Sequence, residues 1–260
     1  MTSLNDPHVE ALYYKIKHGD HVDYSKTAPL ELTRDGFRLK LQDGRAEILL
    51  GVHIPSVETA RAFVEPFLQA WELHMNLAYG PGALEFVYER PVLIDRQPSP
   101  KTTVFSVQAA NVVVTGCVVR LCVGFANFPT PKTELARDAA VDLMYARYVA
   151  YREGRTLLGD AANYCLTAIM LGAHTTRRQD AAKHYRVADK ILGKVGYLAD
   201  HKGGAHARKA KGSGEEFTGK ERLWLEEAMR VLIRRAAEVA HDPHASLPQI
   251  TMAELPSLSD

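Results

Sequence analysis

The sequence predicts an α+β protein, in which a mainly antiparallel sheet with one helix precedes a C-terminal four-helix bundle. Residues 1–128 contain alternating and β-branched runs separated by turn signals, whereas residues 130–242 show helical spacing and helix-capping motifs. Hydrophobic residues make up 46% of the chain and charged residues 24%, as in globular proteins. We therefore expect a β-rich domain over 1–128, a helical domain over 130–242 and a C-terminal tail over 243–260.

Strands are expected where apolar and polar residues alternate. The LYYKI segment near the N-terminus fits a short strand, and Phe37–Leu41 alternates as a half-buried strand does. Asp43-Gly44 separates this run from Ala46–Ile54, and this combination predicts a β-hairpin. Two further runs rich in β-branched and aromatic residues are predicted as strands: Leu84–Asp95 and Thr102–Phe125.

One helix is expected within this first half. Ser56 begins a segment with apolar residues at helical spacing, and Trp71 on its apolar face should be buried. Pro66 should kink or restart the helix, because proline has no backbone N–H to donate. The glycines at positions 80 and 82 should end it.

The second half should fold into four helices. Thr130, with Pro131 at the first helical position, is a good helix start. The sequences TRRQ from Thr176 and TGKE from Thr218 have the spacing of capping boxes, in which side chain and backbone satisfy each other's free donors. The expected helices span about 131–153, about 155–172, a single run from Thr176 that reaches Lys194, and a run that follows Thr218.

Positive charge is concentrated in one part of the chain. The whole protein has a net charge of +1, which argues against polyanion binding on totals alone. Residues 1–128 contain 12 lysines and arginines against 14 aspartates and glutamates, whereas residues 174–222 contain 12 against 6, together with four histidines. This local excess predicts a surface that contacts a polyanion such as RNA.

The predicted helix after Thr176 carries an arginine and a histidine seven residues apart, Arg177 and His184. At about 100° per residue the two side chains project in nearly the same direction, and His184 falls within the apolar arc. In one interpretation His184 is a general acid or base and Arg177 binds phosphate. In the other, His184 is a hydrogen-bonded residue at the edge of the core, and Arg177 is an exposed residue of the first turn.

A second combination of arginine and histidine occurs near the end of the last helix, where His241 follows Arg234 and Arg235. Arg234 and His241 should point away from the apolar arc that contains Leu232. We expect both in solvent, with Arg234 and Glu238 forming a pair four residues apart.

Eight basic residues are candidates for nucleic-acid contacts. Four share an arc of the helix after Thr176, and four belong to its end and to the glycine-rich segment that follows. Neutralising several phosphates gives salt-dependent binding without sequence preference. The alternative is an ordinary solvated face and loop. The eight residues are Lys183, Arg186, Lys190, Lys194, Lys202, Arg208, Lys209 and Lys211.

A β-rich first half followed by a four-helix bundle with an Arg-x(4–6)-His motif resembles the prokaryotic HEPN-domain proteins, over about residues 130–242. That family is an α-helical bundle, commonly dimeric and often a metal-independent ribonuclease of toxin or anti-phage systems. The resemblance implies an endoribonuclease without a cofactor, with Arg177 and His184 at its site. The family usually has a polar residue after the arginine, whereas Arg178 follows Arg177 here, so a bundle without catalysis fits as well.

Two functions from different classes therefore remain open. The first is an RNA-binding protein or a metal-independent ribonuclease. The second is a non-enzymatic assembly or adaptor protein, in which the sheet domain binds a protein partner and the bundle forms homo-oligomers.

Signals for metals, membranes and secretion are weak. The pairs His18-x-x-His21 and His241-x-x-His244 have metal-like spacing, but neither has a partner pair at a recognisable distance, so no metal site is expected. The N-terminus has no signal-peptide pattern, and the longest apolar stretch contains Arg120. With three widely placed cysteines, we expect free thiols, a cytoplasmic location and no membrane contact.

Overall fold

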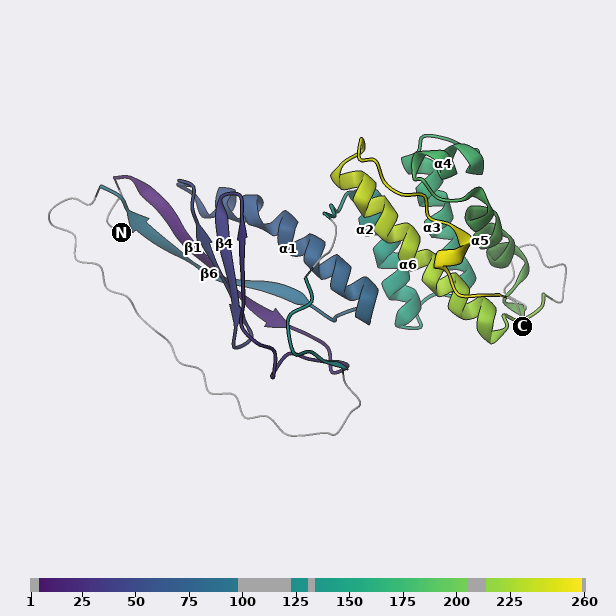
Figure 1. The fold of residues 1–260 in the computed structure, drawn as a ribbon, viewed down its shortest axis with the longest axis horizontal. Helices are drawn as coiled ribbons and strands as arrows, with labels where there is room; N and C mark the ends of the chain where they lie inside the picture. Colours follow the sequence, from purple (N-terminus) through teal and green to yellow (C-terminus); the bar gives the residue numbers. More distant parts are fainter. Residues whose placement is uncertain (1–4, 98–122, 131–133, 205–213, 259–260) are drawn as a thin grey trace. The chain divides into compact units, whose positions relative to one another are not determined.

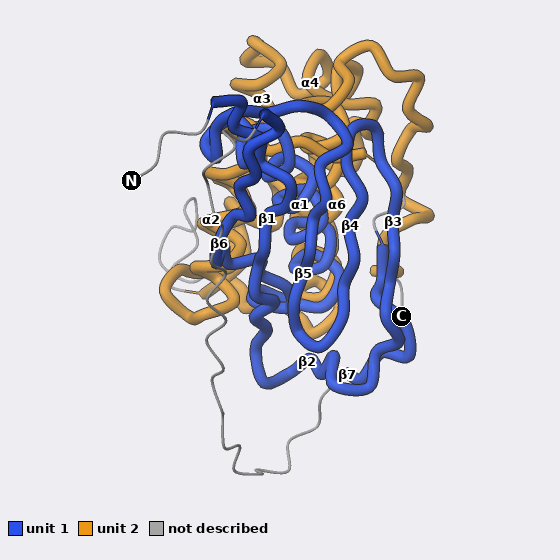
Figure 2. Tube along the Cα trace, turned by 90° about the vertical axis from the view of Figure 1, so that its left-hand side faces the viewer, with its two compact units in different colours: residues 1–131 blue, residues 132–260 orange. Residues whose placement is uncertain are grey.

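The chain forms two compact units, residues 1–131 and residues 132–260 (Figures 1 and 2). The predicted α+β class is confirmed, because the first unit is a five-stranded antiparallel sheet with one helix and the second packs helices α2 to α6 together. The computed structural model describes residues 5–97, 123–130, 134–204 and 214–258.

The first unit is a sheet that packs against helix α1. Its strand order is β3-β4-β5-β1-β6, with all neighbours antiparallel, and Figure 2 shows this order across the sheet. Strands β2 and β7 form a separate parallel pair. The elements are β1 Pro7–Lys17, β2 Val22–Asp23, β3 Leu30–Arg34, β4 Phe37–Gln42, β5 Arg45–Leu50, α1 Val57–Tyr79, β6 Glu85–Asp95 and β7 Val123–Gly124.

The predicted hairpin at Asp43-Gly44 is confirmed. Asp43 (φ 51°) and Gly44 (φ 70°) both lie in the left-handed region, as a two-residue hairpin turn requires, and they join β4 to β5. The predicted strand at Leu84–Asp95 is confirmed as β6, whereas β3 was not predicted. The predicted strand Thr102–Phe125 lies mostly outside the described residues.

Helix α1 supplies one side of the core of the first unit. Ser56 caps it by accepting from the Thr59 N–H, and Gly80 (φ 107°) ends it. Of the two effects predicted for Pro66, a kink or a restart, the restart is wrong, because the helix continues through this residue. Buried apolar side chains on both sides of Pro66 hold the two turns on the sheet. Trp71 is fully buried, as predicted, and its indole N–H donates to the Pro129 carbonyl at 2.6 Å.

The second unit is all helical. The structure shortens the first predicted helix, since residues 134–138 are not helical and Asp138 caps α2 by accepting from the Val141 N–H. The Thr218 capping box at the start of α6 is confirmed, and Trp224 in the first turns of this helix is fully buried. The elements are α2 Ala139–Arg152, α3 Leu158–Gly172, α4 Arg178–His184, α5 Asp189–His201, α6 Gly219–His241 and a short 3₁₀ helix at Met252–Glu254.

Two sequence expectations concern thiols and membranes. Cys165 is a free, fully buried thiol, and burial raises its pKa to about 12. Cys117 and Cys122 lie outside the described residues. Within the described ranges, no helix combines the length and the apolar character that crossing a membrane requires.

Candidate functional site

The helix predicted after Thr176 is interrupted, and the interruption builds the candidate site. Helix α4 ends at His184, and α5 begins only at Asp189. Between them, Arg186 has a φ of 50°, in the left-handed region that residues other than glycine rarely occupy. The predicted capping box at Thr176 is also absent, because Arg177 is the N-cap residue and makes no side-chain cap. The prediction of one continuous helix is therefore wrong; we name the turn between the two helices the α4–α5 junction, residues 185–188.

A buried arginine of α6 holds the junction. The Arg235 side chain is 4% exposed, and its Nη1 donates to the carbonyl oxygens of Tyr185 at 2.9 Å and Arg186 at 3.0 Å. Its Nε donates to Glu238 Oε2 at 2.8 Å, so the buried charge is compensated. These bonds satisfy carbonyl groups at the end of α4 that a continuing helix would have used. The predicted pair of Arg234 with Glu238 is wrong, because Glu238 pairs with Arg235 instead.

The C-terminal tail completes the junction. Ile250 donates its N–H to the Arg186 carbonyl at 2.8 Å, and Ala188 donates to the Ile250 carbonyl at 2.8 Å. The Ile250 side chain is buried, and Figure 1 shows the tail, in yellow, passing the helices of this unit. Segments about 60 residues apart in the sequence therefore share one short parallel β-bridge, Val187 with Ile250. The tail is thus an integral part of the second unit.

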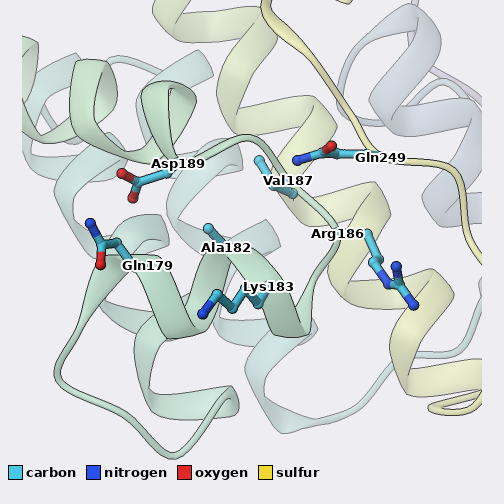
Figure 3. Close-up of a pocket in the computed structure, with 7 residues that line it drawn as sticks. All are labelled: Gln179, Ala182, Lys183, Arg186, Val187, Asp189 and Gln249. Atoms are coloured by element: carbon cyan, nitrogen blue, oxygen red, sulfur yellow. The ribbon is translucent and has the colours of Figure 1, made fainter.

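A pocket of about 530 Å³ lies at this junction (Figure 3). The buried residues Ala182 and Val187 give it an apolar wall. Figure 3 shows the side chains of Gln179, Lys183 and Asp189 pointing toward one side, whereas the Arg186 side chain points away from them. Within the part of the chain that the structure describes, the polar side chains of this pocket form no hydrogen bond or ion pair with one another. The lining residues are Gln179, Ala182, Lys183, Arg186, Val187, Asp189 and Gln249.

The two residues predicted as catalytic stand at opposite ends of α4. Arg177 is the N-cap residue and His184 the last helical residue, a separation of about 10 Å along the helix axis. Arg177 lines another pocket of about 520 Å³, next to His174 and Asp180. His184 is exposed, and its ring contacts the Tyr185 ring edge-on at 4.7 Å. His184 lines neither this pocket nor the pocket at the α4–α5 junction.

The basic residues predicted to contact nucleic acid fall into separate groups. Lys183 and Arg186 line the junction pocket, and Lys190 is exposed in the first turn of α5. The Lys194 ammonium lies 5.1 Å from the centre of the Tyr197 ring, and Tyr197 is half exposed. The remaining three, Arg208, Lys209 and Lys211, lie outside the described residues.

Lys202 differs from the other predicted basic residues. Its ammonium lies 2.5 Å from Glu215 Oε2 and 3.6 Å from Glu221 Oε2, and its side chain is 12% exposed. The hydrogen bond that Lys202 donates to Glu215 raises the pKa of Lys202 and keeps the ammonium charged. Two carboxylates thus neutralise this cation. Lys202 joins the end of α5 to Glu215 and Glu221 and is largely shielded from solvent.

The surface of α4, the junction and α5 keeps a positive excess after these contacts. Asp200 is buried, so the exposed acidic residues between positions 177 and 201 are Asp180 and Asp189. Against these two aspartates stand six lysines and arginines that no carboxylate neutralises in the described structure. The six residues are Arg177, Arg178, Lys183, Arg186, Lys190 and Lys194.

The described part of the chain also contains no group of three or more histidine, cysteine, aspartate or glutamate residues that could hold a metal ion. No family model, no curated protein and no solved structure matches this chain. The fold and the site therefore define a class only: an α+β protein of one sheet unit and one helical unit, with a polar pocket at a strained turn of the helical unit.

Proposed function

We propose that this protein binds single-stranded RNA through the exposed surface of α4, the α4–α5 junction and α5. The observation that carries this proposal is the set of six unneutralised cations against two exposed aspartates, and two of these cations, Lys183 and Arg186, line a pocket of about 530 Å³. Phosphate neutralisation by such a surface supplies most of the affinity for a polyanion. His201 stacks on the half-exposed Tyr197 ring beside Lys194, with the two ring centres 4.8 Å apart, and this exposed aromatic pair adds a surface on which a base can stack.

The test is a binding titration with the full chain. Fluorescence anisotropy of a labelled single-stranded RNA of mixed sequence is followed from about 50 to about 200 mM salt. Four phosphate contacts predict a slope of about −3 in a plot of log affinity against log salt, because each contact on a single strand contributes about −0.7. A chain that does not bind RNA at low salt overturns the proposal.

Charge reversal locates the surface. Lys190→Glu combined with Lys194→Glu should weaken binding at low salt by about tenfold or more and flatten the salt slope. The matched control is Lys17→Glu combined with Lys26→Glu, two exposed lysines of the first unit. Equal losses in both double variants would mean that net charge alone, and not this surface, determines binding.

Ribonuclease activity, implied by the HEPN resemblance, is a separate proposal with a stricter requirement. Since Arg177 and His184 lie at opposite ends of α4, about 10 Å apart along its axis, this proposal includes a homodimer that brings His184 of one copy to Arg177 of the other. His184→Ala should then abolish cleavage of a labelled RNA and leave its binding unchanged. Absence of RNA binding, combined with stable oligomers in light scattering, would support the assembly or adaptor function instead.

A further inference from the structure

We infer that the junction pocket holds the base of a guanine nucleotide. The inference rests on the proposed function when the nucleotide is part of RNA, but the same chemistry accepts a free guanine nucleotide. Asp189 is its central residue, together with Gln179 and Lys183, and Figure 3 shows all three pointing toward one side of the pocket.

Asp189 is the group that phosphate binding alone does not explain. A carboxylate in a cationic surface repels phosphate and weakens a purely electrostatic site. Asp189 is exposed and has no ion-pair partner in the described part of the chain, although Lys183 lines the same pocket. An unpaired carboxylate in such a pocket suits a ligand that presents N–H donors.

Guanine is the RNA base that meets this requirement best. Its Watson–Crick edge carries two adjacent donors, the ring N1–H and the N2 amino group, and the two oxygens of one carboxylate accept both. The amide of Gln179 can donate to the neighbouring O6, which completes the edge. Adenine, cytosine and uracil lack this pair of adjacent donors.

The remaining lining accounts for the rest of a nucleotide. Ala182 and Val187 are buried and offer the face of a base an apolar wall. The Lys183 ammonium supplies a cation for the phosphate of the same nucleotide. The volume of about 530 Å³ lies within the range of about 300–1,000 Å³ that is usual for small-molecule pockets.

The test compares two single-stranded RNAs of equal length, one with guanine and one built from adenine, cytosine and uracil only. The full chain should bind the guanine-containing strand about tenfold more tightly, as for one well-formed bidentate base contact. Asp189→Asn should abolish this preference, because it weakens the binding of the guanine-containing strand. Loss of the negative charge alone would instead strengthen binding of both strands.

The matched control is Asp180→Asn. It removes the same charge from the first turn of α4, at a residue that does not line the junction pocket, so the guanine preference should remain. A further arm titrates GMP and AMP alone by calorimetry against the full chain and the Asp189→Asn variant. Selective binding of GMP that Asp189→Asn removes would support the pocket even where neither RNA strand binds.

The outcomes separate the two proposals. If both strands bind equally and GMP shows no advantage over AMP, the guanine pocket is wrong and RNA binding stands. If neither strand binds, RNA binding is wrong, and the GMP titration alone decides on the pocket.

Discussion

Asp43, His174 and Arg186 are the described non-glycine residues in the left-handed region, and the chain reversals at Asp43 and Arg186 are stabilised in different ways. At Asp43 (φ 51°) the reversal is local, since Gly44 follows and the antiparallel pairing of β4 with β5 closes it. At Arg186 (φ 50°) the reversal joins two helices, and its partners come from elsewhere in the chain: Arg235 of α6 and Ile250 of the tail.

The difference shows where this protein builds its candidate site. A local hairpin needs only its own residues, so its shape depends little on the rest of the unit. The α4–α5 junction takes its shape from contacts with α6 and with the tail, and the tail also lines the pocket through Gln249. A backbone conformation that costs about 1–2 kcal/mol is kept there by surrounding contacts, which is common at functional sites. Variants that act on one reversal and spare the other can test this contrast.

The largest effect is expected from Arg235→Ala. The substitution removes both bonds to the junction carbonyls and leaves the largely buried Glu238 without its partner. Breaking a buried ion pair in this way should lower the free energy of unfolding by about 3–5 kcal/mol, measured by urea denaturation.

Arg234→Ala is the matched control for Arg235→Ala. Arg234 is the neighbouring residue of α6, and its Nε has no hydrogen-bond partner in the described structure. We expect a loss of about 1 kcal/mol or less. Similar losses in both variants would show that Arg235 contributes by packing and not by holding the junction.

The second largest effect is expected from Ile250→Ala, which removes a buried side chain of the tail. The cost should be about 2–3 kcal/mol, near the low end for buried isoleucine because the tail lies at the surface of its unit. Met252→Ala is the control, since Met252 is an apolar tail residue that is 36% exposed. If the junction is independent of the tail, both variants should show the same small loss of stability in thermal denaturation.

Gly44→Ala tests the local reversal and should have a smaller effect. A Cβ at Gly44 would meet no atom within 4 Å, so the cost is the left-handed conformation alone, about 1 kcal/mol. Gly193→Ala in α5 is a control of opposite sign, because its Cβ would also lie in open space but its backbone is helical. This variant should gain about 0.5–1 kcal/mol in unfolding free energy. A lower unfolding free energy for Gly193→Ala would mean that the added Cβ makes an unfavourable contact, contrary to the open space around Gly193.

The same contrast explains what the sequence could predict. The hairpin at Asp43-Gly44 and the capping box at Thr218 are encoded within a few residues, and both were predicted correctly. The break between α4 and α5 was missed because no glycine or proline marks it. Its cause is Arg235, some 50 residues further along the chain.

One signal for Arg235 was nevertheless present in the sequence. Arg235 lies three residues after Leu232 and one before Ala236, which places an arginine inside the apolar arc of the last helix. A charged residue in such an arc needs a buried partner. The position of the tail against the junction had no such signal, because parallel pairing of Val187 with Ile250 leaves no local pattern. The guanine pocket depends on both features, so it could be inferred only from the structure.

The smallest effect is expected where the end of α5 meets the segment before α6. The ion pair of Lys202 with the exposed Glu215 joins these two segments. The Lys202 hydrogen bond lowers the pKa of Glu215, and Gly203 and Gly204 donate backbone N–H groups to the Glu215 carbonyl at 2.9 and 3.2 Å. A carboxyl group with a lowered pKa stabilises the folded state above its usual pKa of 4.5, and this contribution is lost as the pH falls through the lowered value.

Amide hydrogen-exchange protection of Gly203 and Gly204 should therefore fall in acid. The decrease should be weak, and smaller at high salt, because Glu215 is exposed. Glu215→Gln should remove this acid dependence and Glu216→Gln should keep it, whereas equal behaviour of the two variants would mean that the backbone hydrogen bonds alone close this segment.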